Sequence, residues 1–298
     1  MKQSRLLAVV SILALLVLAI PVFGQSDAIE PNIFFQNVWV RSTPSADATP
    51  EPGAVSAAYM TIANAGGVGV RLLSAVSPVA EIVEIHEMRM NGDVMEMRPV
   101  EGGLDILPGG VTVLEPGGYH LMMLNLTQPL VVGQAVPFTL TFETYDNAGE
   151  LTGETFTVEI AAPVLAEAPE PNNLAFSLIW ARPADEGTTS ATYMHILNFG
   201  DPDTLVGAST DVAGVVEIHN MTMNGDVMEM RPVEDGVPLA YGDIGLLEPG
   251  GLHIMMMDLT QALEEGSAFT LTLQFESGTQ VTVGVPIYDR TMMEMSGM

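Results

Sequence analysis

Two sets of histidine and methionine residues recur in this chain at matching positions. The first set is His86, Met97, His120 and Met122, and the second is His219, Met230, His253 and Met255. Thioether sulfur is a soft, uncharged ligand that favours Cu(I), and imidazole accepts several metals. Two imidazoles and two thioethers suit Cu(I) or Ag(I), whereas zinc and calcium usually take thiolate, imidazole or oxygen ligands. The pattern therefore predicts one Cu(I) site in each copy.

Each set belongs to a longer repeat. The sequence from Val83 to Glu101 returns from Val216 to Glu234 with only two positions changed. A second shared segment, Leu-Glu-Pro-Gly-Gly, comes shortly before His120 and again shortly before His253. Four of the five histidines fall within the pattern. The fifth, His195, has no counterpart in the first half, and we interpret it as incidental.

The first part of each repeat has the pattern of a β-hairpin. Asn-Gly between two alternating runs is a strong hairpin signal. A two-residue turn at Asn91-Gly92 would place His86 opposite Met97 and Met88 opposite Met95. A four-residue turn keeps the same register. Since side chains alternate along a strand, all four would share one face of the ribbon. In the second copy, the same turn pairs His219 with Met230.

The remaining ligands lie on a later strand. His120 and Met122 project from one face of that strand, and the Pro-Gly-Gly turn before them would deliver the histidine at a loop edge. His253 and Met255 repeat the arrangement. Nearby glutamates are interpreted as surface charge, on the opposite strand face or beyond the motif: Glu84, Glu96, Glu217 and Glu229.

A different interpretation assigns the methionines to packing. Methionine is a flexible side chain that commonly fills gaps in a hydrophobic core. The two copies are not independent support for a metal site, because duplication of one ancestral segment would repeat any pattern. What favours the metal site is that histidine and methionine recur together at one spacing.

Composition excludes several classes of function. The 298 residues include 37 Asp and Glu against 9 Lys and Arg, a formal charge of −28. If the N-terminal segment with Lys2 and Arg5 is removed, the charge becomes 7 − 37 = −30. Such a surface repels phosphate backbones, so nucleic acid is excluded as a partner. The chain has no cysteine, which excludes disulfides and thiolate metal sites.

The order of segments predicts two tandem domains. Many short strands punctuated by Gly and Pro predict an all-β protein with two tandem antiparallel β-sandwiches. An apolar run after Lys2 and Arg5 predicts export, through a cleaved signal peptide or an uncleaved anchor. The expected boundaries are 1–24 for the signal or anchor, 25–160 for the first domain, 161–171 for a Pro-rich linker, 172–288 for the second domain and 289–298 for a Met-rich tail.

At these motifs the chain resembles the PCu(A)C family of bacterial copper chaperones. The His-Met-His-x-Met motif and the strings Met-Arg-Pro-Val-Glu and Leu-Glu-Pro-Gly-Gly carry the resemblance in both halves. It implies a cupredoxin-like β-sandwich with Cu(I) near one end, and delivery of copper to the copper centres of cytochrome c oxidase. Most members have one such domain, whereas this chain has two. The tail beyond Asp289 is similar to tails of some members. Such a tail would capture or pass on copper, and the alternative is a frayed terminus without this role.

The leading hypothesis is therefore an exported Cu(I) carrier rather than an enzyme, located in the periplasm or outside the cell. Its partners would be copper and a copper-acceptor protein such as a cytochrome c oxidase subunit, with membrane contact only through an uncleaved N-terminal segment. One alternative is sequestration of copper or silver for metal tolerance. Another is an exported adhesion-type or structural β-sandwich whose methionines are core. Metal titration separates the last from the first two.

Overall fold

The computed structural model describes residues 32–43, 53–92, 94–224 and 227–288. All regular secondary structure in these ranges is β-strand. The described part of the chain contains no helix of the length and apolar character that a membrane crossing requires. The predicted signal or anchor, residues 1–24, and the Met-rich tail, residues 289–298, lie outside the described residues.

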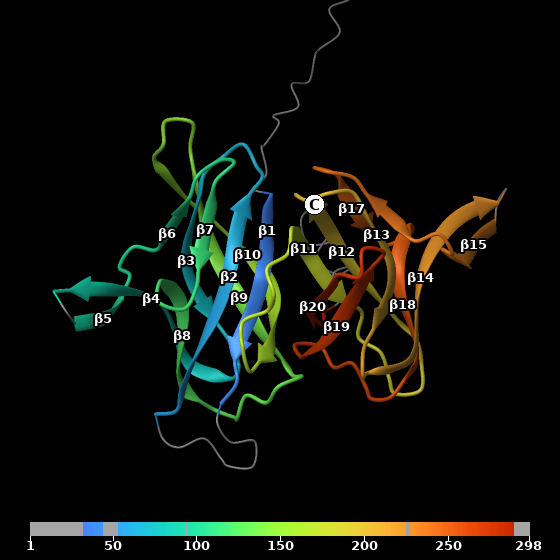
Figure 1. The fold of residues 1–298 in the computed structure, drawn as a ribbon, viewed down its shortest axis with the longest axis horizontal. Helices are drawn as coiled ribbons and strands as arrows, with labels where there is room; N and C mark the ends of the chain where they lie inside the picture. Colours follow the sequence, from blue (N-terminus) through green and yellow to red (C-terminus); the bar gives the residue numbers. More distant parts are fainter. Residues whose placement is uncertain (1–31, 44–52, 93, 225–226, 289–298) are drawn as a thin grey trace, which may run out of the picture.

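The first half of the chain forms a sandwich of two sheets (Figure 1). The strands of one sheet, in spatial order, are β1 (Ile33–Arg41), β2 (Val55–Asn64), β7 (Val111–Leu114) beside β8 (Tyr119–Leu126), β4 (Ala80–Asn91) and β5 (Val94–Pro99). The strands of the other are β6 (Leu104–Ile106), β3 (Val70–Val76), β9 (Ala135–Tyr145) and β10 (Leu151–Leu165).

The second half repeats this arrangement. Its first sheet contains β11 (Leu174–Ala181), β12 (Ser190–Asn198), β17 (Ile244–Leu247) beside β18 (Leu252–Leu259), β14 (Ala213–Asn224) and β15 (Val227–Pro232). Its second contains β16 (Val237–Leu239), β13 (Asp203–Ser209), β19 (Ala268–Phe275) and β20 (Gln280–Pro286). The prediction of two all-β sandwiches in tandem is confirmed. Most pairings are antiparallel, but β1 with β10, β7 with β8 and β17 with β18 are parallel.

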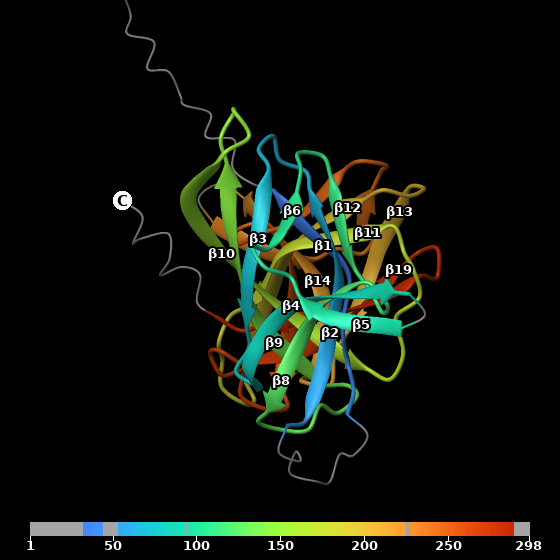
Figure 2. The ribbon, with the colours of Figure 1, turned by 90° about the vertical axis from the view of Figure 1, so that its left-hand side faces the viewer.

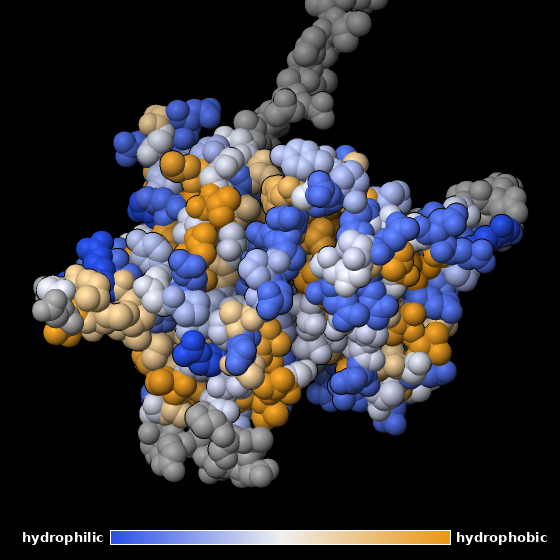
Figure 3. Space-filling model, in the orientation of Figure 1, coloured by the Kyte–Doolittle hydropathy of each residue, from blue (hydrophilic) through white to orange (hydrophobic). Residues whose placement is uncertain are grey.

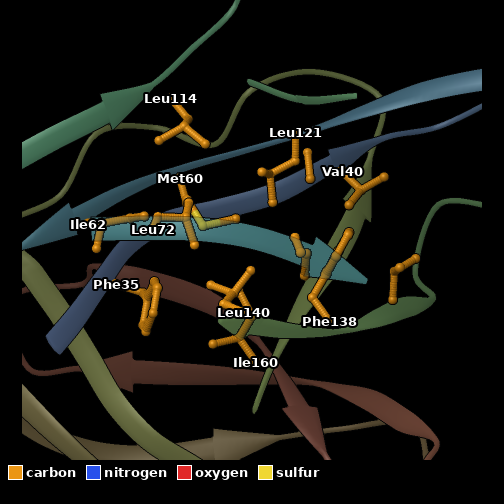
Figure 4. Packing of buried hydrophobic residues seen from close by; sticks show 14 of the residues in the cluster. Phe35, Val40, Met60, Ile62, Leu72, Leu114, Leu121, Phe138, Leu140 and Ile160 are labelled. Atoms are coloured by element: carbon orange, nitrogen blue, oxygen red, sulfur yellow. The ribbon is translucent and has the colours of Figure 1, made fainter. Parts of the chain in front are cut away.

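The core of each half lies between its two sheets. Strand β9 shows how the sequence builds it, because alternate residues such as Phe138, Leu140 and Phe142 are buried while their neighbours are only partly covered. They face Met60 and Leu121 from the opposite sheet (Figure 4). The core does contain methionines, but Met60 is not one of the residues in the repeated His/Met motif.

The strand β10 extends further than the sequence suggests. Residues 161–165, assigned by the sequence to the start of the linker, form its last part. Ala161, Ala162 and Val164 are almost fully buried, and Val164 pairs with Val40 of β1. Burial of these apolar side chains outweighs the missing N–H of Pro163, which would otherwise disfavour a strand.

The two halves pack side by side and join both sheet layers. Strand β1 pairs with β11 through Phe35 and Phe176, and β10 pairs with β20 through Ala161 and Gly284. Phe35 and Phe176 pair with corresponding isoleucines of their own halves, so the β1–β11 junction brings corresponding positions of the two halves together. A Cβ at Gly284 would collide with the backbone of Ala161, so the close approach requires glycine.

This junction sets where the repeated hairpins lie. The β4–β5 hairpin projects at one end of the molecule and the β14–β15 hairpin at the opposite end, with the junction between the halves in the middle (Figure 1). Figure 2, turned by 90°, shows β4 and β5 running across the face of the first half.

Candidate metal site

The β4–β5 hairpin has a different turn from the one predicted. Asn91 pairs with Val94, so the turn begins at Gly92, which has a φ of 66°. A two-residue hairpin turn needs this left-handed backbone at its first position, and glycine adopts it without a steric penalty. The predicted turn at Asn91-Gly92 is therefore wrong by one residue.

This turn changes which residues face each other. Met88 pairs directly with Met97, and His86 pairs with Pro99. The predicted direct pairing of His86 with Met97 is wrong, and Met97 lies diagonally across from the histidine. Each partner moves by two positions, so the alternation of side chains is kept and the two residues still share a face. In the second hairpin, His219 likewise pairs with Pro232 and Met221 with Met230.

The two histidines of each half lie directly opposite each other on adjacent strands. His86 of β4 pairs with His120 of β8, and their ring centroids are 5.8 Å apart. His219 of β14 pairs with His253 of β18, at 6.0 Å. The four side chains are buried, with exposed fractions of 8%, 3%, 8% and 2% in the same order. They lie on the outer face of the sheet, since adjacent residues such as Ile85 point into the core.

The methionines extend the array on the same face. Met122 pairs with Glu84 one step along from the two histidines, and it is partly buried. Met97 is 46% exposed, so it lies at the rim of the arrangement. Met255, paired with Glu217, and Met230, 43% exposed, occupy the corresponding places in the second half.

Hydrogen bonds orient one histidine of each pair through a carboxylate. The Nε2 atom of His86 lies 2.8 Å from Oε2 of Glu84, and the same contact joins His219 and Glu217 at 2.8 Å. A carboxylate only accepts, so a neutral imidazole in this position carries its proton on Nε2. The Nδ1 atoms of His86 and His219 are buried and have no hydrogen-bond partner. Each therefore presents a free lone pair.

The partner histidine is held by the backbone. The Nδ1 atom of His120 lies 3.2 Å from the carbonyl oxygen of Gly118, and that of His253 lies 3.0 Å from the carbonyl oxygen of Gly251. Donation of the Nδ1 proton to the carbonyl leaves the lone pair on Nε2. Gly117, just before Gly118, has a φ of 88°, so the Pro-Gly-Gly turn sets the position of this carbonyl.

An aromatic row lies beside each pair of histidines. Trp39 stacks on Tyr59 at 4.7 Å, and Tyr59 lies 6.3 Å from the ring of His120. Trp180 and Tyr193 take the same places beside His253. The spacing of the histidines and methionines does not indicate these aromatic residues. The repeated Trp-x-Arg and Ala-x-Tyr-Met strings signal them, but only the folded sheet shows that they border the histidines.

Burial favours the neutral imidazole. It lowers the pKa of His120 and of His253, although the hydrogen bonds to the glycine carbonyls raise it in part. The neighbouring His86 and His219 add to the decrease. Metal coordination requires an unprotonated nitrogen, so the surroundings of these histidines suit a ligand role.

Two acidic residues contact the histidines, contrary to the prediction. Glu84 and Glu217 are predicted to be surface charge, on the opposite strand face or beyond the motif, but each stands two residues before a histidine on the same strand and shares its face. The same alternation rule that grouped the methionines would have found them. Glu96 and Glu229 form ion pairs with Arg98 and Arg231, in agreement with surface charge.

The fifth histidine has a different partner. His195 of β12 forms an ion pair with Glu248, with 2.7 Å between Nε2 and Oε1. Within the described ranges, no three His, Cys, Asp or Glu side chains come together in a group that could hold a metal ion. The candidate sites are thus defined by paired imidazoles and thioethers.

Comparison with known proteins identifies relatives of both halves. The chain matches the family described as putative lipoprotein LpqE-like over residues 33–163 and again over 174–287. It is 30% identical over 130 residues to the putative lipoprotein Lxx21020 of Leifsonia xyli subsp. xyli (strain CTCB07), covering 43% of this chain and 78% of that protein. It is 33% identical over 114 residues to the uncharacterized protein RP573 of Rickettsia prowazekii (strain Madrid E), covering 36% of this chain and 62% of that protein.

Similar solved structures each correspond to part of the chain. The copper-bound PCuAC domain from PmoF2 is 26% identical, with a TM-score of 0.32, over 39% of this chain and 92% of that domain. The apo PCuAC domain from PmoF1 is 26% identical, with a TM-score of 0.33, over 40% of this chain and 97% of that domain. The family model matches both halves, and each match contains one complete His/Met set. The chain belongs to the LpqE-like family.

Proposed function

We propose that this protein is an exported copper chaperone that binds one Cu(I) ion in each half and delivers it to an acceptor such as the copper centres of cytochrome c oxidase. The observation that carries the proposal is a buried imidazole nitrogen without a partner, Nδ1 of His86, directly beside a second buried histidine. His219 repeats it in the second half. A buried polar atom without a partner is costly, and a metal ion would satisfy it.

The proposed ligands of the first half are Nδ1 of His86, Nε2 of His120 and the thioethers of Met122 and Met97. Metal–imidazole bonds are about 2 Å long, so two rings with centroids 5.8 Å apart can contact one ion between them. Glu84 contacts the other nitrogen of His86, Nε2. A carboxylate on the nitrogen that does not bind the metal fixes the tautomer of a ligating histidine and raises its basicity. In the second half, His219, His253, Met255 and Met230 take these roles, with Glu217 behind them.

The ligand types select the oxidation state. Two thioethers favour Cu(I), whereas Cu(II) prefers nitrogen and oxygen ligands in tetragonal geometry. The positions of the ligands suit a carrier rather than a permanent centre. His86 and His120 are buried, but Met97 is 46% exposed. An exposed thioether at the rim can be displaced by a ligand of the acceptor while the histidines still hold the ion.

The hairpin methionines of the motif, Met97 and Met230, differ in solvent exposure from the methionines of the core. Met60 and Met123 are 1% and 0% exposed and pack between the sheets, whereas Met97 and Met230 are 46% and 43% exposed. This contrast argues against the adhesion-type sandwich in which the motif methionines serve as core. It does not separate delivery from sequestration, which would use the same ligands.

The proposed acceptor rests on the resemblance to PCu(A)C chaperones, and export rests on that resemblance together with a family and one relative named as putative lipoproteins. We expect membrane attachment to occur through the apolar N-terminal segment, residues 1–24, if that segment is not cleaved. We infer a carrier role rather than catalysis, with the tail beyond Asp289 as a further source of thioethers.

X-ray absorption spectroscopy of the Cu(I)-loaded protein tests the proposed site. The expected spectrum shows nitrogen and sulfur scatterers together, and oxidation should release copper or replace the sulfur. His86→Asn with His120→Asn should remove the imidazole contribution of one half and leave that of the other. A first shell without sulfur, or one unchanged by the histidine substitutions, would contradict the proposed ligands.

A further inference from the structure

The β4–β5 hairpin continues its row of methionines beyond the candidate site. Met88 pairs directly with Met97, and Met90 pairs directly with Met95. The alternation of the strands places all four on the face that carries His86. The opposite face is charged, with ion pairs between Arg89 and Glu87 and between Arg98 and Glu96. Beyond the pair of His86 and Pro99, this side of the ribbon therefore carries the four thioether side chains.

This thioether face is open to solvent. Met90 is 64% exposed, Met95 is 54% exposed and Met97 is 46% exposed. The projecting hairpin is largely apolar on the side that faces the viewer in Figure 3. Side chains that remain this exposed contribute little hydrophobic stabilisation to the fold, since that term follows the area removed from water. Packing within the chain does not account for them.

The choice of residue points to sulfur rather than to hydrophobicity. Leucine, isoleucine or valine would serve an apolar surface on a strand as well as methionine or better. Yet all four positions are methionine, and the second hairpin has the same residues in the same register, Met221 with Met230 and Met223 with Met228. A thioether differs from those side chains by being a soft ligand for Cu(I) and Ag(I).

We propose that Met88, Met90 and Met95 form a second, open soft-metal site, through which Cu(I) enters and leaves the buried histidine site. Met97 lies between the two sites, opposite Met88 and diagonal to His86. The site is expected to be weaker than the buried one, because its ligands are solvent-exposed thioethers without an imidazole. Its role as an entry path rests on the proposed chaperone function, whereas metal binding by the thioethers does not.

The transfer is a ligand exchange. Copper remains Cu(I), and bonds from copper to the outer sulfurs break as bonds to Nδ1 of His86 and Nε2 of His120 form. Those two nitrogens carry lone pairs in the tautomers set by Glu84 and Gly118, so no proton has to leave. No electron is transferred, and no other reactant is needed.

Nuclear magnetic resonance with methyl-labelled methionine tests the outer site directly. Ag(I) is added to the whole protein, and each methyl signal is assigned by single Met→Leu substitutions. We expect Met122 and Met97 to respond first, and Met90 and Met95 to respond at higher Ag(I). In His86→Asn/His120→Asn, Met90 and Met95 should still respond. Signals of Met90 and Met95 that stay unchanged in both proteins would overturn the outer site, even if the buried site binds normally.

Loading kinetics test the path. Transfer of Cu(I) from a small chelator is followed for the wild type, Met90→Leu/Met95→Leu and Met90→Gln/Met95→Gln. We expect both variants to load the first half several-fold more slowly and to release copper more slowly by the same factor. The equilibrium affinity of the buried site should not change, because only the path is altered.

Val94 offers a matched control. It belongs to the same hairpin, lies on the charged face and is 62% exposed, so Val94→Leu changes an exposed apolar side chain without touching sulfur. This variant should load at the wild-type rate. Wild-type loading by the leucine pair together with slow loading by the glutamine pair would show an apolar docking surface instead. Wild-type loading by both pairs would equally overturn the entry path.

Discussion

At the scale of single residues, the carboxylates behind the histidines distinguish this site from ordinary core packing. Glu84 holds Nε2 of His86 and leaves the buried Nδ1 free, and Glu217 does the same for His219. Outer partners of this kind typically change metal affinity by about 10- to 100-fold when they are removed. The proposed metal site thus includes the residue two positions before the first histidine.

We expect Glu84→Ala to weaken Cu(I) binding in the first half by about 10-fold or more, because His86 loses the group that fixes its tautomer. The second half should keep its affinity. Glu101→Ala is the matched control, since it removes the same charge from an exposed turn position of the first half. Competition titration with a Cu(I) chelator measures both variants. Equal affinities for the two would show that Glu84 acts only as surface charge.

Stability should depend on pH through the second histidine of each pair. Burial lowers the pKa of His120 and of His253 in the folded protein, while imidazole in the unfolded chain protonates near about pH 6.5. The unfolded state therefore binds more protons as the pH falls below that value, and the folded state is destabilised. The contribution of these two histidines to the stability of the fold is therefore fully present above the pKa of the unfolded state. It is lost as the pH falls through the lower pKa of the folded state.

Urea unfolding of the metal-free protein at about pH 7.5 and about pH 5.5 measures this dependence. His120→Gln and His253→Gln should each reduce the loss of stability between the two values. Variants that lose as much stability as the wild type would show that these histidines do not contribute.

At the scale of elements, the sequence predicts the strands better than their pairing. Alternation placed His86, Met88 and Met97 on one face without knowledge of the register, because a shift of two residues preserves it. The turn could not be located from Asn-Gly alone, since either position of the dipeptide can begin a two-residue loop. Only the pair of Asn91 with Val94 shows that Gly92 is the first turn residue.

This register gives Met97 a rim position that a conservative substitution can test. We expect Met97→Leu to weaken Cu(I) binding while changing the free energy of unfolding by less than about 1.5 kcal/mol, because the volume is nearly conserved. Met123→Leu is the comparison, since Met123 is 0% exposed and lies in the core rather than at the site. It should leave Cu(I) affinity unchanged. Wild-type affinity in Met97→Leu would remove Met97 from the ligand set.

At the scale of the whole molecule, the two halves form a pseudo-symmetric pair. The repeat predicted two sandwiches, but it could not predict that β1 joins β11 or that β10 joins β20. Such contacts depend on a few small or apolar residues at corresponding positions, and no short motif marks them. Phe34, Ala63, Ala175 and Leu197 form the separate cluster at this junction.

Gly284 is the position most sensitive to this arrangement. We expect Gly284→Ala to lower the free energy of unfolding by about 1 kcal/mol or more, because the added Cβ collides with the backbone of Ala161. Cu(I) affinity should not change, since the hairpins project at opposite ends of the molecule (Figure 1). Denaturant unfolding and Cu(I) competition on one preparation check both points. A loss of affinity would show that the junction shapes the sites.

The number of tightly bound Cu(I) ions shows whether each half holds its own metal site. With the hairpins at opposite ends, the two sites are too far apart to share an ion. The measurement is an anaerobic Cu(I) titration against a competing chelator, with residues 289–298 deleted so that the methionines of the tail add no site. We expect two tight equivalents per chain, falling to one in His86→Asn/His120→Asn and likewise in His219→Asn/His253→Asn. A chain that binds a single tight equivalent, or none, would contradict it.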